Sequence, residues 1–211
     1  MSGIMLNIVG ATYGGGALAI GDPYQGGFYA GQISTAGTGV ANFNLVIGPV
    51  ASAASQLQWK TSNSGSDPTS VINGPANSSA MNSTTYPAAY FCEGLTVGGY
   101  TDWYLPAKNE LEICYYNLKP TTASNASSGI NANAVPARGS NYTAGNPAQT
   151  TASRFITSTG AEAFTASGTG YWSSTEYSGS YANFQIFTTG SQSYGSKTFS
   201  NFTRAVRRVA V

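Results

Sequence analysis

The residues that could do chemistry are few and widely spaced in this chain of 211 residues. Histidine is absent, so the commonest general base and the commonest metal ligand are both missing. The spacing of the acidic residues predicts no oxygen-rich calcium site. It also singles out no pair of carboxylates for glycoside hydrolysis. The acids stand singly, at Asp22, Asp67, Glu93, Asp102, Glu110, Glu112, Glu162 and Glu176. We therefore expect no catalytic residue, no metal ion and no cofactor.

The two cysteines, Cys92 and Cys114, are too few for a Cys-rich metal site or a disulfide framework. Cys114 falls on the apolar face of a segment with helical periodicity. We expect it to be a core residue rather than a reactive thiol.

Recognition is the chemistry that the last third of the chain favours. Its Tyr, Asn, Ser and Gly residues are those of antibody paratopes, in which Tyr gives broad contact and the small polar residues adapt their hydrogen bonds. The alternative is that Tyr, Thr and Phe are simply good strand formers on a solvated sheet. The candidate binding residues are Tyr177, Tyr181, Asn183, Gln185, Phe187, Gln192, Tyr194, Phe199, Asn201 and Phe202.

Charge excludes two classes of partner. Only 8% of residues are charged and the net charge is +1, which provides no electrostatic attraction for nucleic acid or an anionic membrane. Strand-like alternation splits the one basic cluster, Arg204, Arg207 and Arg208, across two faces, which indicates a structural role. A surface made polar by hydroxyls and amides is typical of extracellular and virion proteins, although salt-rich habitats and composition drift produce it too.

The N-terminal region, residues 1–26, is predicted to be an arm for attachment or assembly. An apolar, β-prone run at residues 4–9 is followed by three glycines at 14–16 and a turn signal at 21–24. The region has no basic start and is broken by the glycines, which argues against a signal peptide and a membrane span. The alternative is that it begins the main domain, predicted at residues 27–211.

Strands are predicted at both ends of the main domain. Residues 27–33 and 42–47 have the pattern of a hairpin. Strand patterns return at residues 170–174, 182–188 and 202–209, joined by short turns, and predict an antiparallel sheet.

Between these two groups of strands, the apolar residues recur with helical periodicity. A first helix is predicted over residues 86–95, with Tyr90, Phe91 and Leu95 packing inward. A second is predicted over residues 105–118, and its apolar face carries Leu111, Cys114, Tyr115 and Leu118. A long irregular region follows, residues 121–169, with one short strand near residues 154–156. Two helices between groups of strands predict an α+β domain.

Three ordered motifs resemble a known family. They are Gly-Gly-Tyr-Thr-Asp-Trp-Tyr-Leu-Pro-Ala-Lys-Asn-Glu-Leu at residues 98–111, Tyr-Trp-Ser-Ser-Thr-Glu-Tyr at residues 171–177 and Arg-Ala-Val-Arg-Arg-Val at residues 204–209. With them, the chain from Gly26 to Val211 resembles the Lcl C-terminal domain family. The resemblance implies a C-type-lectin-like fold, with two helices packed on an antiparallel sheet and long irregular loops. Formylglycine-generating enzymes and the variable receptor-binding proteins of phage share this fold.

The resemblance also implies structural roles for several motif residues. Trp103 and Leu105 would seat the second helix, Trp172 would enter the core, and Asp102 would cap a helix or turn. The expected ion pairs join Glu110 or Glu176 to Arg204 or Arg207.

The enzyme branch of this fold needs a pair of reactive cysteines late in the chain. Cys92 and Cys114 lie in the middle instead, which argues against that activity and favours buried thiols that could be adjacent. The Glu-Pro-Asn and Trp-Asn-Asp strings of calcium lectins are also absent.

The leading hypothesis is a non-enzymatic phage virion protein on the particle exterior, with a lectin-like domain for host attachment on a tail fibre. Its expected partners are other virion proteins, bound through the arm, and a host surface glycan or protein. A homo-oligomer is expected, with a trimer as a reasonable form. The alternative is a purely structural decoration protein of capsid or tail, and a minor one is a polysaccharide-active enzyme.

Overall fold

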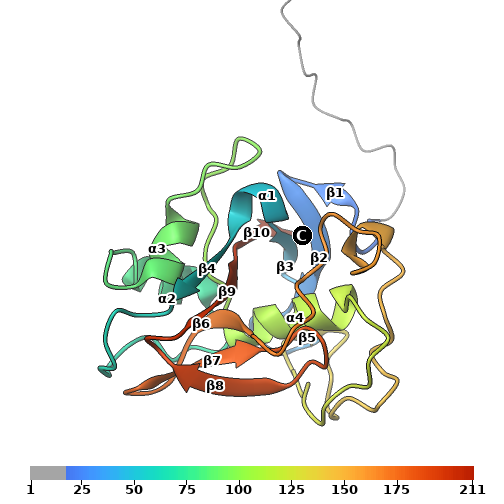
Figure 1. Cartoon of the computed structure of the whole chain (residues 1–211). Coiled ribbons are helices and arrows are strands. Elements are labelled where there is room, and N and C mark those ends of the chain that lie inside the picture. The colour runs from blue at the N-terminus through green and yellow to red at the C-terminus, as the bar shows by residue number, and fades with distance from the viewer. Residues whose placement is uncertain (1–17) are drawn as a thin grey trace, which may run out of the picture.

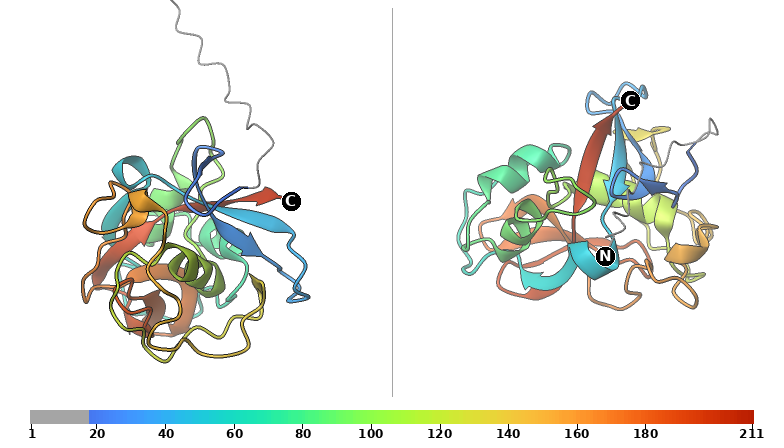
Figure 2. Two further views of the ribbon diagram at one scale, coloured as in Figure 1. Left: turned by 90° about the vertical axis from the view of Figure 1, so that its right-hand side faces the viewer. Right: turned by 90° about the horizontal axis from the view of Figure 1, so that it is seen from above.

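The computed structural model describes residues 18–211. Within this range the chain forms two five-stranded sheets and four α-helices, which confirms the predicted α+β class. Helix α4 (Lys108–Leu118) lies at the centre, and α2 (Gly74–Ala80) and α3 (Pro87–Glu93) gather at one side (Figure 1). Seen from above, strand β10 passes between α4 and the α2–α3 pair (Figure 2). No helix in this range has the length and apolar character that a membrane crossing requires.

The first sheet has the order β1-β2-β3-β10, with β5 paired to β2. Strands β2 and β3 are the predicted hairpin, and they pair antiparallel. Their register shifts between Tyr29 and Gly31, where the φ of Gly31 is +122° and a Cβ atom would lie 2.3 Å from Nδ2 of Asn117 in α4. Glycine therefore lets α4 approach this sheet closely. The strands are β1 (Pro23–Tyr24), β2 (Gly27–Ile33), β3 (Phe43–Ile47), β5 (Ala134–Val135) and β10 (Val206–Ala210).

The second sheet has the order β4-β9-β6-β7-β8. Its pairs are antiparallel, except for a short parallel contact between β6 and β9 at Tyr171 and Phe202. The strands are β4 (Ala54–Gln58), β6 (Tyr171–Ser178), β7 (Tyr181–Gln185), β8 (Gln192–Ser196) and β9 (Ser200–Arg204).

The C-terminal strands differ from the prediction in two ways. The strand predicted over residues 202–209 is interrupted at Ala205, so that β9 lies in the second sheet and β10 in the first. Strand β8 forms where the glycines around residues 190–195 indicated only a turn. The predicted antiparallel pairing is confirmed for β6 and β7, but the chain builds two sheets and divides the last predicted strand between them.

Helix α4 (Lys108–Leu118) confirms the second predicted helix and its apolar face, although it starts three residues later than expected. Leu111, Cys114, Tyr115 and Leu118 are all buried. The helix contacts β2 of the first sheet and β6 and β7 of the second, which explains why few of its side chains reach solvent.

Helix α3 (Pro87–Glu93) confirms the first predicted helix but only part of its predicted inward face. Tyr90 is 48% exposed, and Phe91 and Leu95 are only partly buried. The buried side chains are small, from Ala88, Ala89 and Cys92. Small residues bring α3 close to its neighbours and leave the large side chains at the rim.

Two helices and one helical turn lie outside the predicted set, as do the short strands β1, β4 and β5. Helices α1 (Val50–Ala53) and α2 (Gly74–Ala80) formed in segments without a clear apolar period. Residues Ser153–Phe155 are a turn of 3₁₀ helix, so the short strand predicted near residues 154–156 is wrong. Phe155 and Phe164 anchor the long irregular region in the core.

The core consists of two clusters of buried side chains. One surrounds α4 and includes Cys114, and the other contains Cys92 and Trp172. Both cysteines are free and buried, as expected, but they belong to different clusters. Trp172 is fully buried, which confirms its core position. Trp103 and Leu105 are buried in the Cys92 cluster with residues of α3, and their expected role as the seat of α4 stays a prediction.

Most of the predicted arm, residues 1–17, lies outside the described residues. Within the remainder, Pro23 and Tyr24 form β1 and pair with Phe28 and Gly27 of β2. The boundary at residue 26 and the attachment role of the arm stay predictions.

Candidate binding surface

Three exposed tyrosines lie together at one end of strands β6, β7 and β8. Tyr177, Tyr181 and Tyr194 are 54%, 43% and 47% exposed. The rings of Tyr177 and Tyr194 are stacked, with centroids 3.8 Å apart and planes inclined by 5°. Tyr181 meets the Tyr194 ring edge-on at 5.6 Å and 68°. We call these three residues the tyrosine cluster.

Strand register explains why the cluster forms. Tyr194 pairs with Asn183, and Tyr181 pairs with Ser196, so the two tyrosines point to the same face of the sheet. The intervening Ala182 points to the opposite face and is buried in the Trp172 cluster. Alternation therefore gives these strands one aromatic face at the surface and one apolar face in the core.

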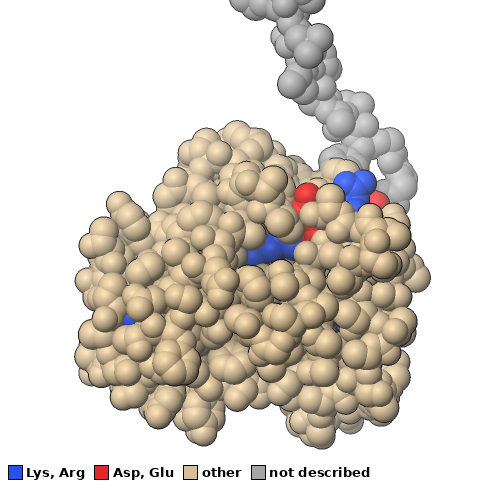
Figure 3. All heavy atoms as spheres, viewed as in Figure 1, with Lys and Arg blue, Asp and Glu red and all other residues tan. Residues whose placement is uncertain are grey.

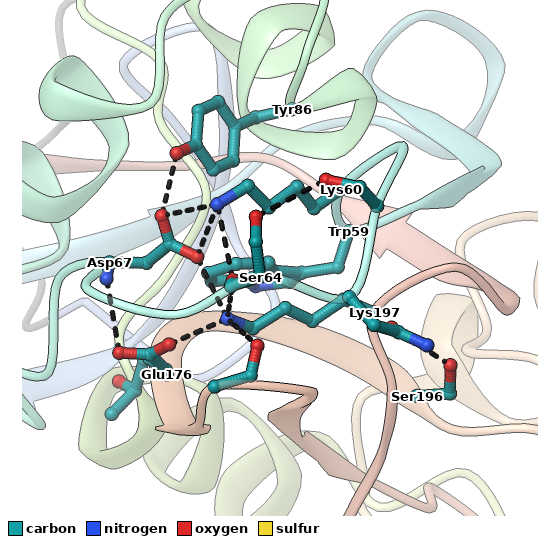
Figure 4. A network of polar contacts seen from close by, with 12 residues as sticks. Trp59, Lys60, Ser64, Asp67, Tyr86, Glu176, Ser196 and Lys197 are labelled. Carbon is teal, nitrogen blue, oxygen red and sulfur yellow. Dashed lines mark hydrogen bonds and ion pairs between the residues drawn. The ribbon is translucent and has the colours of Figure 1, made fainter.

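Beneath the cluster lies a group of four charged side chains, Lys60, Asp67, Glu176 and Lys197, which we call the buried ion network (Figure 4). Asp67 accepts hydrogen bonds from Lys60 at 2.8 Å and 2.9 Å, one to each carboxylate oxygen, and from Lys197 at 2.8 Å. Lys197 also donates to Glu176 at 2.6 Å. The Tyr86 hydroxyl completes the group with a 2.6 Å hydrogen bond to Asp67.

The buried ion network holds the backbone that carries the cluster. Glu176 directly precedes Tyr177, and its carboxylate accepts a 3.1 Å hydrogen bond from the backbone N–H of Asp67. Lys197 donates to the carbonyl of Gly179, at 3.0 Å, in the turn between β6 and β7. Both sides of this turn are thus tied to the segment around residues 60–68, and Tyr177 and Tyr181 lie at its two ends.

The charges of the network compensate one another. Burial disfavours the ionised form of Asp67, but hydrogen bonds from Lys197, Lys60 and Tyr86 outweigh it and lower the pKa of the carboxyl. Burial likewise opposes the charge on Lys60, yet its contacts with Asp67 and Tyr86 raise the pKa of the ammonium group. Two positive and two negative side chains leave no net charge beneath the cluster.

The cluster consists of aromatic rings and hydroxyls and contains no Lys, Arg, Asp or Glu. Interaction with the side chain of Tyr194 is the main cause that raises the pKa of Tyr177. In the view of Figure 3, nearly all of the surface is free of charged side chains. Aromatic faces and hydroxyls, rather than ions, are therefore what the candidate surface offers a ligand.

Of the other predicted binding residues, only Asn183 and Gln192 lie beside the cluster. Both are partly buried, and Asn183 donates a 3.1 Å hydrogen bond to the Thr175 carbonyl.

Gln185 and Phe187 are corrections to the predicted set, because their side chains are 2% and 0% exposed. Gln185 donates to the Gly190 carbonyl, and Phe187 stacks on Phe164 with ring centroids 3.8 Å apart. Both side chains lie in the interior and are removed from the candidate surface.

The remaining three residues lie elsewhere on the second sheet. Phe199 is 65% exposed in the turn between β8 and β9. Asn201 and Phe202 are partly buried on β9, which β6 separates from β7 and β8. The structure thus brings together about half of the predicted set and disperses the rest.

A second surface feature escaped the sequence reasoning. An apolar groove of about 580 Å³ runs beside α3 and is lined by Leu57, Thr84, Pro87, Tyr90, Phe91, Gly94 and Leu95. The signal was present in Tyr90, Phe91 and Leu95, which the helical period assigned to the core. All three line the groove, although Phe91 and Leu95 also pack partly against the Cys92 cluster.

The acidic side chains are mostly engaged in ion pairs. Beyond the buried ion network, the expected pairs are wrong in detail, since Arg204 pairs with Glu162, Arg207 with Asp102, and Arg208 with Glu110. Asp102 therefore serves an ion pair and not the expected cap.

Two buried glutamates belong to separate polar groups around α4. Burial raises the pKa of Glu110, although Arg208 and the Tyr104 hydroxyl favour its ionised form. Glu112 is bound by Arg138 and by the Tyr142 hydroxyl. In residues 18–211, no group of three His, Cys, Asp or Glu side chains is placed to hold a metal ion.

The sequence was compared with models of known protein families. The model of the Lcl C-terminal domain matches residues 48–207, from the end of β3 into β10. The chain belongs to the Lcl C-terminal domain family. The match includes the motifs at residues 98–111 and 171–177, and with them the whole tyrosine cluster of this Lcl C-terminal domain. No curated protein matches the chain.

Proposed function

We propose that this Lcl C-terminal domain protein is a non-enzymatic binding protein on the exterior of a phage particle, with the tyrosine cluster as its attachment surface for a host glycan or protein. The observation that carries the proposal is the cluster itself. Three aromatic rings, each about half exposed, stand together on a rigid sheet instead of in the core.

The energetics of binding support this use of the cluster. Tyr rings supply large contact area and have few torsions to restrict, so they are frequent among the residues that dominate binding energy. The buried ion network fixes the turn between β6 and β7 before a ligand arrives, and such preorganisation lowers the entropic cost of association. Neighbouring Ser and Gly residues at 178–180 provide room and hydrogen-bonding groups around the rings.

We further propose a C-type-lectin-like arrangement for the domain. In support, helix α3 contacts β4, helix α4 contacts β2, β6 and β7, and residues 121–169 form a long and mostly irregular region. The N-terminal arm would attach the protein to other virion proteins, in a homo-oligomer that could be a trimer.

A decoration role is the second candidate, and the apolar groove beside α3 favours it. A groove of about 580 Å³ lined almost wholly by apolar side chains suits contacts between virion subunits. In this case the groove, not the tyrosine cluster, would carry the functional contact.

Location on the particle tests the proposal. Antibodies against the chain, bound to purified phage particles and seen by electron microscopy, should mark a tail tip or fibre. Marking of the capsid surface alone would favour decoration, and absence from particles would overturn both virion roles.

A further inference from the structure

The contact between Tyr177 and Tyr194 has a geometry that bears on their reactivity. The two rings are stacked, with centroids 3.8 Å apart and planes inclined by 5°. Stacked rings at this separation are in van der Waals contact, so radicals formed on both rings would be held side by side. Both residues are about half exposed, so a reagent in solution can reach them.

We propose that Tyr177 and Tyr194 form an oxidative cross-linking site, at which hydrogen peroxide and a haem-peroxidase-type catalyst join the two rings as dityrosine. Within residues 18–211, the tryptophans and cysteines compete poorly for the oxidant. Trp59, Trp103 and Trp172 are at most 1% exposed, and the two cysteines are fully buried.

The reaction balances without any group from the chain beyond the two rings. Each phenol gives up one electron and one proton and becomes a phenoxyl radical. The radicals combine at ring carbons next to the oxygens and form one carbon–carbon bond. The hydrogens on these carbons then move to the oxygens and restore both phenols. One hydrogen peroxide accepts the two electrons and two protons and becomes two waters, so the chain loses two hydrogen atoms.

The cross-link would fasten the edge of the second sheet. Strand β8 is the last strand in the order β4-β9-β6-β7-β8, and Tyr177 is on β6. A bond from Tyr177 to Tyr194 encloses β7 (Tyr181–Gln185) in a covalent loop. A closed loop reduces the freedom of the unfolded chain, so the cross-linked protein should unfold at a higher temperature.

The site overlaps the surface assigned to binding, but it rests on ring geometry and not on any ligand. Formation of the cross-link can therefore succeed or fail whether or not the cluster binds a host molecule.

The test treats the full chain, at low concentration, with hydrogen peroxide and a haem peroxidase. Dityrosine is read by its fluorescence, and the intact mass shows whether the monomer has lost two hydrogen atoms. Trypsin leaves residues 155–197 in one peptide, so mapping uses chymotrypsin, which can cut after Tyr181 or Phe184 between the two rings.

Substitutions to Phe keep the ring and remove only the reactive hydroxyl. We expect Tyr177→Phe and Tyr194→Phe to lose the intramolecular product. Tyr90→Phe should retain it, because Tyr90 is equally exposed, at 48%, but lies in the groove beside α3. Tyr181→Phe should also retain it, since Tyr181 meets Tyr194 edge-on. An undiminished yield in Tyr177→Phe, or dityrosine found only in covalent dimers, would overturn the proposal.

Discussion

Replacing Lys197 by Met tests whether the buried ion network holds the tyrosine cluster in place. The Lys197 side chain is fully buried, and its ammonium group donates to four oxygens at 2.6–3.0 Å. Met keeps the length of the side chain but removes the charge and every one of these bonds. Glu176 would then be a buried carboxylate without a cationic partner.

The magnitude follows from the burial. Removing one partner of a buried ion pair costs about 3–5 kcal/mol, because the remaining charge stays desolvated. For a chain of this size the loss corresponds to a fall in melting temperature of about 6–20 °C. We expect a matching fall in the free energy of unfolding measured by urea denaturation at neutral pH.

The loss of stability caused by Lys197→Met should depend on pH. The pKa of Asp67 is lowered in the folded protein, so its contribution to stability is present above the ordinary carboxyl pKa of about 4 and is lost as pH falls through the folded value. Met at position 197 removes one cause of that lowered pKa. The stability difference between wild type and Lys197→Met should therefore shrink under acidic conditions.

Lys108→Met is the matched control. Lys108 is partly buried at the start of α4 and forms no ion pair with any residue in 18–211. Its replacement should change the unfolding free energy by no more than about 0.5 kcal/mol. A loss below about 1 kcal/mol for Lys197→Met, or one that is equal at neutral and acid pH, would refute the role given to the network.

Three further predictions concern the core. Trp172→Ala should lower the free energy of unfolding in urea by about 3–5 kcal/mol, since the ring is fully buried; a neutral result would contradict its core assignment. Gly31→Ala should lower the melting temperature, because the φ of +122° is strained for Ala and the added methyl meets Asn117; an unchanged melting temperature would show that α4 can shift at no cost. Burial raises the pKa of Cys92 and of Cys114, so neither thiol should react with a thiol reagent until the chain is denatured, and rapid labelling of the native protein would contradict the buried positions.

Local patterns were sufficient to predict the elements that obey one period. The face of α4 was readable because Leu111, Cys114, Tyr115 and Leu118 follow helical spacing. The β2–β3 hairpin was readable from its two short apolar runs. The same approach failed for α3, where the tightest packing uses Ala88 and Ala89 and leaves Tyr90 outside, a choice that depends on the neighbouring elements.

The candidate site was predictable where strand alternation alone decides exposure. Tyr181 and Asn183 share a face with Gln185, but the end of β7 is covered, and the Gln185 side chain contacts the Tyr142 hydroxyl. Alternation carries no information about a loop that folds back from another part of the chain. The buried ion network could not be predicted from the sequence for the same reason, since Lys60 and Lys197 come together only after the chain has folded.

Binding to host cells tests the central claim most directly. Fluorescently labelled full chain is titrated against a panel of bacterial strains in a flow cytometer, and the strain with the strongest signal is used to compare variants. Tyr194 contacts both other rings of the cluster, so Tyr194→Ala should weaken binding by about 30-fold or more, as expected for a dominant contact of about 2 kcal/mol. Its melting temperature should stay near that of wild type, and Tyr90→Ala should bind normally. Equal binding by wild type and Tyr194→Ala, or no binding of wild type to any strain, would contradict the account.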